Sequence, residues 1–257
     1  MISIYSYGKD SSGKGQLTPR EKDVVQEFPL PLIVNGREIA TLIASPHDLR
    51  FLVAGFLRLQ GFVARVEDFT LFSVCTDFGV AKVEIKGELP ERLKPVLTSG
   101  CGTGITYTIP KALQQGGVGL PERRFTADAV FAMMDEMGKV AQRYSSHGGM
   151  HSAAVGDGSI TLWSEDLGRH NTMDRIAGEA LLKGIDISGM ILVTSGRVSS
   201  ELVAKASLLG IPLVASRTSP TNMAVKIADE AGITLIGYVR GGKFDVYSHP
   251  ERLEMGR

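Results

Sequence analysis

The sequence predicts an α/β fold in two domains, and two patterns support this prediction. In the C-terminal half, the apolar segments MILVT, IPLVAS and ITLIGYV alternate with helix-like segments. Near-continuous apolar strands separated by helices are typical of a mostly parallel sheet covered by helices on both faces, which is a three-layer domain. In the N-terminal half, a hairpin, a helix and further strands follow one another, which favours a smaller α+β domain of the β-grasp kind.

The small domain is expected over residues 21–90. Asn35-Gly36 lies between two apolar runs, and such a pair is the strongest short-range signal for a β-hairpin. Ser45 and Pro46 predict the start of a helix, because serine suits the N-cap and proline the first turn. Two strands, LFSVCTDF and VAKVEI, should follow this helix. The helix itself carries one apolar stripe, formed by Leu49, Leu52, Val53, Phe56 and Leu57.

The remaining boundaries follow from composition. Residues 1–20 are rich in Gly, Ser and Lys and are expected to form a mobile tail, and residues 91–124 are expected to connect the two domains. The larger domain is then expected over residues 125–257. Thr126 should cap its first helix, whose apolar stripe we interpret as core: Val130, Met134, Met137, Ala141 and Tyr144.

Capping residues, glycine and proline indicate where further elements of the larger domain begin and end. HSAAV and SITLW have the character of strands. One helix should begin at Asn171 or Thr172 and end near Gly184. Two more helices should end at Gly210 and Gly232, the second of them starting at Ser219-Pro220.

Composition narrows the class of protein. The 28 basic and 28 acidic residues cancel, which argues against a general partner of nucleic acid or of membrane surfaces. Two cysteines in 257 residues do not make a disulfide framework. No segment has the character of a signal peptide or of a membrane span, so we expect a cytoplasmic protein with reduced thiols.

The two cysteines occur in different settings. Cys101 lies in the stretch TSGCGTG, where the surrounding glycines should display the thiol on a loop. Such a thiol is a candidate nucleophile, because a glycine loop offers backbone N–H groups that stabilise a thiolate. Cys75 lies in a strand, on the opposite face from Phe72, Val74 and Phe78, and a structural role is favoured for it.

Three loops of the larger domain combine arginine with small residues. They follow the three apolar strands, and the carboxyl ends of parallel strands meet at one edge of a sheet, where ligands bind. Arginine and the backbone N–H groups of a helix N-terminus are suited to phosphate, so the loops predict a site for a phosphorylated ligand. The alternative is that each arginine caps a carbonyl or pairs with an acid. The loop residues are Ser195, Gly196 and Arg197, then Arg217, then Arg240, Gly241, Gly242 and Lys243.

Another polar cluster, EDLGRHN, covers residues 165–171. It is compatible with a site, or with a structural role in which Asp166 fixes Arg169 and Asn171 caps a helix. His147 and His151 have a spacing that would suit zinc on a helix, but the glycines between them disfavour a helix, so no metal site is expected.

These motifs resemble the FdhD family of formate dehydrogenase accessory sulfurtransferases. The resemblance runs in order over residues 24–253 and includes GGMHSAAV, EDLGRHNTMDRIAGEAL and SGRVSSELVAKASLLG. It implies a cytidine-deaminase-like fold for the larger domain and a homodimer. It also implies that a persulfide on Cys101 carries sulfur from a cysteine desulfurase to the molybdenum bis(molybdopterin guanine dinucleotide) cofactor of formate dehydrogenase. The cofactor-contacting segment of the family falls on Tyr238, Val239, Arg240, Gly241, Gly242 and Lys243.

One departure from the family pattern leaves alternatives open. The family loop typically carries C-x-x-C, but Gly104 stands at the second position, so the loop cannot form an internal disulfide. The chain could therefore be a chaperone that binds the guanine dinucleotide cofactor without moving sulfur. A third possibility, a nucleotide-dependent enzyme of deaminase ancestry, is disfavoured because zinc deaminases need both H-x-E and P-C-x-x-C. At His151-Ser152-Ala153 the acid of H-x-E is absent, and the sequence has no P-C-x-x-C.

Overall fold

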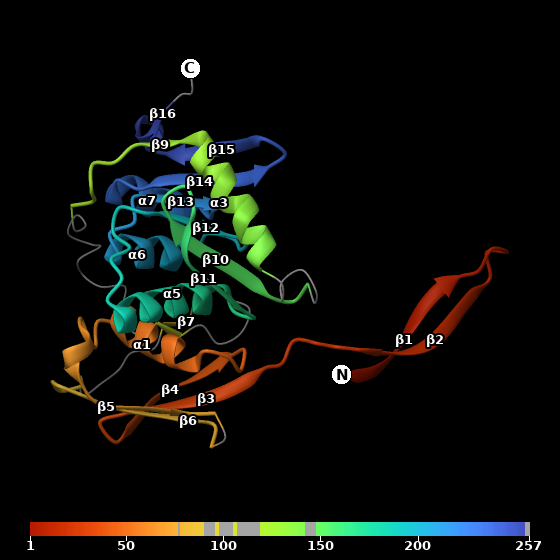
Figure 1. The fold of residues 1–257 in the computed structure, drawn as a ribbon, viewed down its shortest axis with the longest axis horizontal. Coiled ribbons are helices and arrows are strands. Elements are labelled where there is room, and N and C mark those ends of the chain that lie inside the picture. The colour runs from red at the N-terminus through yellow and green to blue at the C-terminus, as the bar shows by residue number, and fades with distance from the viewer. Residues whose placement is uncertain (77, 90–95, 98–104, 107–118, 142–147, 255–257) are drawn as a thin grey trace.

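A six-stranded sheet forms the middle layer of the larger domain (Figure 1). Its order is β11-β10-β12-β13-β14-β15. The computed structural model describes the whole chain except residues 77, 90–95, 98–104, 107–118, 142–147 and 255–257. The strands are β10 (His151–Gly156), β11 (Ile160–Asp166), β12 (Ile191–Thr194), β13 (Leu213–Ser216), β14 (Thr234–Arg240) and β15 (Lys243–Ser248).

The expectation of a mostly parallel sheet is wrong. Strands β12, β13 and β14 are parallel, but three of the five pairings within the described sheet are antiparallel. Two of these three pairings, β10 with β11 and β14 with β15, join consecutive strands through tight turns. Gly241 and Gly242 adopt φ angles of 58° and 71°, which lets β14 fold straight back as β15, and Gly158 (φ 77°) lies in the turn between β10 and β11.

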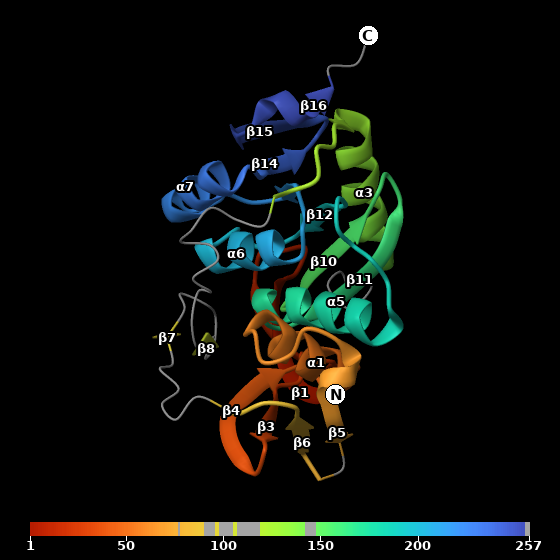
Figure 2. The same cartoon turned by 90° about the vertical axis from the view of Figure 1, so that its left-hand side faces the viewer.

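Helices cover both faces of the sheet, as the three-layer prediction requires (Figure 2). Alternate strand residues face opposite layers. Leu192, Val214 and Leu235 pack with α5 (Arg169–Lys183), α6 (Ser200–Leu208) and α7 (Asn222–Ala231). Val193 and Ala215 pack on the other face with the methionines of α3 (Ala127–Val140). Val130, Met134, Met137 and Ala141 of the predicted stripe are buried, as expected for core, and Tyr144 lies outside the described residues. Thr126 caps α3 by accepting a hydrogen bond from the Ala129 N–H at 3.1 Å.

The small domain has a four-stranded mixed sheet with one helix packed on it. Its order is β4-β3-β6-β5, with β3 parallel to β6. The predicted hairpin is confirmed, with Asn35 and Gly36 at φ 48° and 76° in its turn. The predicted apolar stripe is buried against the sheet, whereas Phe78 lies beyond its strand and is 85% exposed. The elements are β3 (Phe28–Val34), β4 (Arg37–Ala44), α1 (Leu49–Leu59), β5 (Phe69–Cys75) and β6 (Val80–Ile85).

Helix starts differ from the sequence prediction. α1 begins at Leu49 with Asp48 as N-cap rather than at Ser45, because the polar groups of Ser45 bind the larger domain instead. α5 begins at Arg169, two residues before Asn171. α7 begins at Asn222 with Thr221 as its cap, after the predicted Ser219-Pro220.

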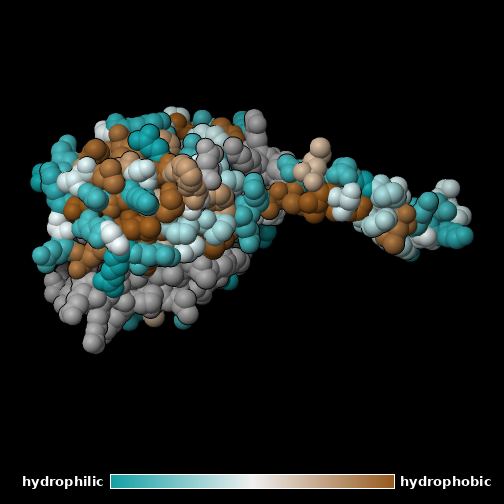
Figure 3. All heavy atoms as spheres, turned by 90° about the horizontal axis from the view of Figure 1, so that it is seen from below, coloured by the Kyte–Doolittle hydropathy of each residue, from teal (hydrophilic) through white to brown (hydrophobic). Residues whose placement is uncertain are grey.

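The N-terminal residues also differ from the prediction of a tail. Strands β1 (Ile2–Lys9) and β2 (Gly15–Lys22) form an antiparallel hairpin that projects from the main body (Figures 1 and 3). Its turn is closed by the Asp10 N–H, which donates to the Lys14 carbonyl at 3.0 Å. Tyr5, Tyr7 and Leu17 on the hairpin are exposed.

The shorter elements complete the chain. A 3-10 turn, η1 (Val66–Asp68), precedes β5, and another, η2 (Pro250–Arg252), follows β15. None of the helices in the described ranges is both long and apolar enough to span a bilayer. The remaining short strands are β7 (Val96–Leu97), β8 (Ile105–Thr106), β9 (Phe125–Thr126) and β16 (Leu253–Glu254).

Two glycines bring the domains into close contact. Helices α1 and α5 cross where Gly55 of one meets Gly178 of the other. A Cβ at Gly55 would lie 1.6 Å from the Asp174 carbonyl oxygen, and one at Gly178 would lie 1.9 Å from the Phe51 carbonyl oxygen. Only the absence of side chains at both positions permits this separation of the helices.

Candidate anion-binding cavity

Two of the three predicted loops meet at a cavity on the carboxyl edge of the parallel strands. Backbone hydrogen bonds hold them together: the Ser195 N–H donates to the Ser152 carbonyl at 2.9 Å, and the Arg217 N–H donates to the Thr194 carbonyl at 3.1 Å. The Ser152 N–H donates in turn to the Ser195 hydroxyl at 2.9 Å. The loops after β12 and β13 are thereby fixed to each other and to the start of β10.

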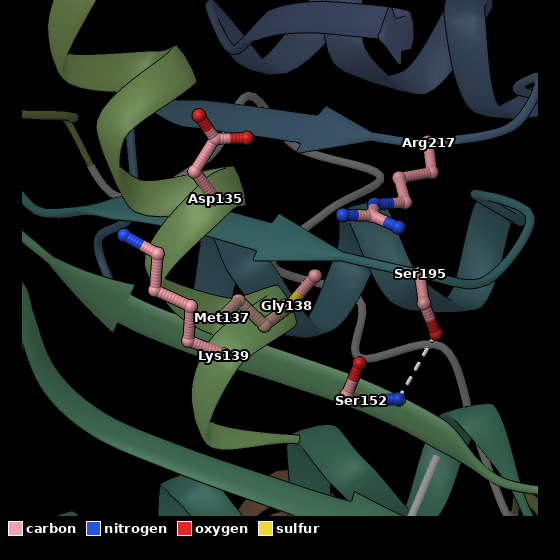
Figure 4. A pocket seen from close by; sticks show the side chains of 7 residues that line it. All are labelled: Asp135, Met137, Gly138, Lys139, Ser152, Ser195 and Arg217. Atoms are coloured by element: carbon pink, nitrogen blue, oxygen red, sulfur yellow. Dashed lines mark hydrogen bonds between the residues drawn. The ribbon is translucent and has the colours of Figure 1, made fainter. Parts of the chain in front are cut away.

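The cavity lies between this edge and α3 (Figure 4). It has a volume of about 310 Å³. Asp135, Gly138 and Lys139 share one face of α3, because residues three and four apart in a helix are neighbours. Arg217 and Ser195 lie on the opposite side in Figure 4. The full lining is Asp135, Met137, Gly138, Lys139, Ser152, Ser195 and Arg217.

Arg217 follows β13 and is half-buried, whereas Lys139, the other cation in the lining, is exposed. Gly138 leaves room for it, since a Cβ at that position would lie 3.0 Å from Nη2 of Arg217. In the part of the chain that the structure describes, no hydrogen bond or ion pair joins the guanidinium to another residue. A half-buried guanidinium without a counter-charge is suited to bind an anion.

The other predicted loop residues lie near the cavity but outside its lining. Gly196 packs behind Ser195, where a Cβ would lie 3.1 Å from Arg169 Cβ and 3.2 Å from His151 Nδ1. The side chain of Arg197 is exposed. Three loops thus lie on one sheet edge, but of the predicted residues only Ser195 and Arg217 line the cavity.

The third loop is the tip of the β14–β15 hairpin. It joins the second loop through the Tyr238 N–H, which donates to the Thr218 carbonyl at 3.2 Å. Arg240 lies 5.6 Å from the centre of the Tyr238 ring, and Gly241, Gly242 and Lys243 are exposed. Val239 points the other way, because its side chain is buried in the core beside α3.

The cluster at residues 165–171 joins the two domains. The buried Asp166 carboxylate pairs with Arg175 at 2.6 Å and accepts a hydrogen bond from the Ser45 N–H at 3.2 Å. Arg175 also donates to the Ser45 carbonyl at 2.8 Å, and Asn171 donates to the Ile43 carbonyl at 2.8 Å. These contacts favour a structural role for Asp166 and Asn171, but through Arg175 rather than the expected Arg169.

A second set of charges is buried between α5 and α6. Lys205 lies 2.8 Å from Asp174 and 3.0 Å from Glu201, and Glu201 lies 3.2 Å from Nδ1 of His170. Burial raises the pKa of Asp174 to about 6 and lowers the pKa of His170 to about 4. The pKa of Lys205 is raised, since Asp174 and Glu201 outweigh its burial. His170 Nε2 also lies 2.9 Å from the hydroxyl of Ser199, the N-cap of α6.

The predicted thiol cannot be placed in this arrangement. Cys101 and His147 lie outside the described residues. Cys75 is a free thiol at the end of β5 and is half-buried. His151 is described, and burial together with Arg169 lowers its pKa. Across the described ranges, no group of three His, Cys, Asp or Glu side chains could hold a metal ion.

Sequence reasoning missed five residues of the cavity lining: Asp135, Met137, Gly138, Lys139 and Ser152, of which Met137 was interpreted only as core. Ser152 could be found only once β10 was known to pair with β12. Gly138 did carry a signal, because a glycine inside a helix is unfavourable by about 1 kcal/mol relative to alanine and so indicates a close approach. Asp135 and Lys139 follow from Gly138 by helical spacing.

Comparison with known proteins agrees with this arrangement of domains and motifs. The family model described as "FdhD/NarQ family" matches residues 25–254.

The chain belongs to the FdhD/NarQ family.

Curated FdhD relatives match over nearly the whole chain. The protein named "Sulfur carrier protein FdhD" of Bacillus subtilis (strain 168) is 34% identical over 247 residues, covering 93% of this chain and 94% of the relative. The protein of the same name from Staphylococcus aureus (strain MRSA252) is 33% identical over 244 residues, with 93% and 92% covered.

A solved structure is similar to this FdhD/NarQ chain throughout. It is described as a "putative formate dehydrogenase accessory protein" from Desulfotalea psychrophila. The two superpose with a TM-score of 0.78 and share 26% identity, covering 98% of this chain and 99% of the other. The two-domain arrangement is therefore shared with that solved protein.

Proposed function

We propose that this protein is a sulfur carrier for formate dehydrogenase, which takes sulfur from a cysteine desulfurase and passes it to the molybdenum bis(molybdopterin guanine dinucleotide) cofactor. The names of its relatives support the sulfur-carrying part. The observation that carries the cofactor part is the cavity with the half-buried Arg217 beside Ser195. A guanine dinucleotide arm presents phosphates, and these need such a cation.

In the first step, the Cys101 thiolate attacks the outer sulfur of the desulfurase persulfide. A new S–S bond forms on Cys101, and the desulfurase cysteine leaves as its thiolate, so charge and atoms balance. We infer that Cys101 is the carrier, because the glycines on either side of it in the sequence favour a segment that displays a thiolate to two partners in turn.

The cofactor is the client of this reaction, and the residues present fit its nucleotide arms. Arg217 and Lys139 supply positive charge in the cavity, and Ser195 supplies a hydroxyl. Arg240 and Lys243 lie exposed on the adjacent hairpin tip, with Tyr238 and its flanking glycines. We propose that phosphate groups of the two arms bind along this edge.

The experiment uses Cys75 as the matched control for Cys101. Wild type, Cys101→Ala and Cys75→Ala proteins are incubated with a desulfurase and cysteine, and each is weighed by mass spectrometry. Wild type and Cys75→Ala should gain one sulfur atom, and Cys101→Ala should gain none. In cells, formate dehydrogenase activity should be lost only in Cys101→Ala, and retention of activity in that variant would contradict the carrier role.

A second candidate function rests on Gly104, which replaces the second loop cysteine of the family pattern. It is a chaperone that holds the cofactor through its guanine nucleotides and transfers no sulfur. The mass measurement separates the two functions, because a chaperone gains no sulfur on Cys101 yet still binds guanine nucleotide.

We also propose that the protein acts as a cytoplasmic homodimer and that its larger domain is related to the cytidine deaminases. These proposals follow from the resemblance to the FdhD family. Light scattering of the purified full-length chain would test the dimer directly, and a monomer at micromolar concentration would contradict it.

A further inference from the structure

The N-terminal hairpin is an arm that projects from the protein. Strands β1 and β2 pair with each other and extend away from both domains (Figures 1 and 3). Every residue of β2 is exposed, and in β1 only Ile4 and Ser6 are partly buried. An isolated two-stranded hairpin is marginally stable in water. We therefore expect this arm to be stabilised by contact with another molecule.

The two faces of the arm differ in chemistry. In the register of the strands, Tyr5 lies opposite Pro19 and Tyr7 lies opposite Leu17, so these four side chains share one face. Tyr5, Tyr7 and Leu17 are 72%, 66% and 60% exposed. The opposite face carries the two cations of β2, which are Arg20 and Lys22. One face is thus aromatic and apolar, and the other is basic.

A cavity lies along an edge strand of the larger domain. Strand β11 is the outermost strand at one side of the six-stranded sheet, and no described strand pairs with its outer edge. Residues 161–165 of this strand, together with residues of α1 and α5, line a cavity of about 520 Å³. We call it the β11 cavity. An open strand edge offers backbone N–H and C=O groups to an added strand, so this edge is suited to receive one.

The two sides of β11 match the two faces of the arm. Trp163 pairs with Ala154, which packs with α3, so its ring lies on the α3 side of the sheet, where it is 39% exposed. On the other side, Asp48 at the start of α1 is exposed, and its carboxylate makes no hydrogen bond or ion pair with a described residue. A hairpin that extends the sheet at β11 continues both of its faces. Its tyrosines can then meet Trp163 while its cations meet Asp48.

The two cations that line the β11 cavity do not oppose such an arm, because each already has a partner. Lys183 lies 2.6 Å from Glu179, and Arg175 lies 2.6 Å from Asp166. Their charges are therefore offset by neighbouring carboxylates. Asp48 adds a negative charge that these pairs do not neutralise, and this favours the basic face of the arm.

The segment that joins the arm to β3 lies near the same edge of the sheet. Val25 of this segment packs on Gly149, where a Cβ would lie 3.1 Å from Val25 Cγ2. Gly149 precedes β10 by two residues, and His151 at the start of β10 pairs with Asp166 at the end of β11. In a two-fold dimer, an arm that leaves one protomer beside its own β11 edge can reach the same edge of its partner. Eight residues of strand span about 26 Å, which is enough to follow the whole of β11.

We propose that two copies of this chain exchange their N-terminal hairpins, so that the arm of each copy lies along the β11 cavity of the other. The inference rests on the proposed homodimer and adds to it the surface through which the dimer forms. It assigns the aromatic face of the arm to the side of Trp163 and the basic face to the side of Asp48.

The first test measures the mass of the full-length protein by light scattering over a range of concentrations. Wild type should be a dimer at micromolar concentration. The double variant Tyr7→Glu, Leu17→Glu places carboxylates on the apolar face of the arm. It should weaken the dimer by at least about 100-fold, because charge is desolvated at two symmetric contacts. Leu71→Glu is the matched control, since Leu71 on β5 is 45% exposed and does not line the β11 cavity. It should change the affinity by less than about threefold.

The second test mixes two variants. Trp163→Glu alters the receiving edge and leaves the arm intact, so alone it should be monomeric where wild type is a dimer. Mixed with the Tyr7→Glu, Leu17→Glu protein, it should form a heterodimer, because one intact arm then meets one intact edge. Asp48→Lys is a second variant of the edge, and the Asp48 side chain makes no capping hydrogen bond to α1. It should weaken the dimer by about tenfold through repulsion of the basic face.

The outcomes separate this inference from the proposed dimer. A wild-type dimer that keeps its affinity in the arm variant and in both edge variants would overturn the exchange while the proposed dimer stands. Monomeric variants that unfold thermally as wild type does, yet form no heterodimer when mixed, would also overturn the exchange. A wild-type protein that is monomeric at every concentration would contradict both proposals.

Discussion

The molecule uses charge in two opposite ways, in its interior and at its sheet edge. In the interior around α5, two buried pairs of opposite charge are formed: Arg175 meets Asp166 at 2.6 Å, and Lys205 meets Asp174 at 2.8 Å. At the cavity, Arg217 and Asp135 lack such partners within the described chain. The difference teaches that paired charges stabilise the interior, whereas we propose that the unpaired charges of the cavity are left for a ligand.

The largest expected effect comes from breaking the interior pair. Asp166→Ala leaves the Arg175 guanidinium buried without its counter-charge, which should lower the free energy of unfolding by about 3–5 kcal/mol. Urea unfolding measures this loss. The control is Lys183→Ala, which removes an exposed partner of Glu179 and should change stability by less than about 0.5 kcal/mol. Equal losses in both variants would contradict the contrast between buried and exposed pairs.

The next effect concerns pH and His170. Its folded pKa is about 4, well below its ordinary 6.5, so the unfolded chain binds more protons between these values. The stability due to a neutral His170 is therefore present above pH 6.5 and is lost as pH falls toward 4. His170→Gln should remove this loss, which amounts to about 3 kcal/mol across the window.

Asp174 titrates in the opposite sense. Its pKa is raised to about 6, so it stabilises the fold as pH falls through 6. Asp174 is present in both wild type and His170→Gln. The difference between their free energies of unfolding at each pH therefore reports on His170 alone. Parallel stability curves for the two proteins from pH 7 to 4 would show that His170 is not held neutral by its surroundings.

A somewhat smaller effect is expected where the helices cross. Gly55→Ala places a methyl group 1.6 Å from a backbone oxygen of α5, so the helices must separate. Overpacking of this kind should lower the free energy of unfolding by about 1–3 kcal/mol. Gly119→Ala, with nothing within 4 Å of its Cβ position, should leave thermal unfolding unchanged. A stable Gly55→Ala variant would mean that the domains are not locked at this crossing.

How far the sequence could predict these two regions depends on the distance between the interacting residues. Local signals worked: Asn35-Gly36 forms the hairpin turn, and Thr126 caps α3. Ser45 failed as a cap because its backbone and hydroxyl bond with Asp166 and Leu167, more than 100 residues away. No local pattern contains such a contact.

The candidate site was predictable to the same extent. Ser195 and Arg217 could be placed at one edge because consecutive parallel strands share it. The wall of the cavity that α3 forms could not be predicted, because the spacing of Asp135 and Lys139 does not indicate which strand ends they face. Paired residues such as Asp174 and Lys205 were missed for the same reason, since each lies on a different helix.

The smallest expected effect on stability comes from the cavity wall, and it has the opposite sign. Gly138→Ala should raise the free energy of unfolding by about 0.5–1 kcal/mol, because alanine favours a helix over glycine. The new methyl group lies 3.0 Å from Arg217 and must displace the guanidinium, so GDP affinity should fall. Thermal unfolding and calorimetry on the same sample measure both changes. A variant that gains stability and binds GDP as tightly as wild type would show that the position of Arg217 is unimportant.

The most direct test of the central claim is a calorimetric titration of GDP into wild type and Arg217→Ala. The cavity account predicts saturable binding to wild type and an affinity at least about tenfold weaker in the variant, since a charged hydrogen bond to phosphate is lost. The free energy of unfolding should stay within about 0.5 kcal/mol, because Arg217 supports no other residue in the described structure. Equal affinity in the two proteins would contradict the claim that this sheet edge binds the nucleotide arms of the cofactor.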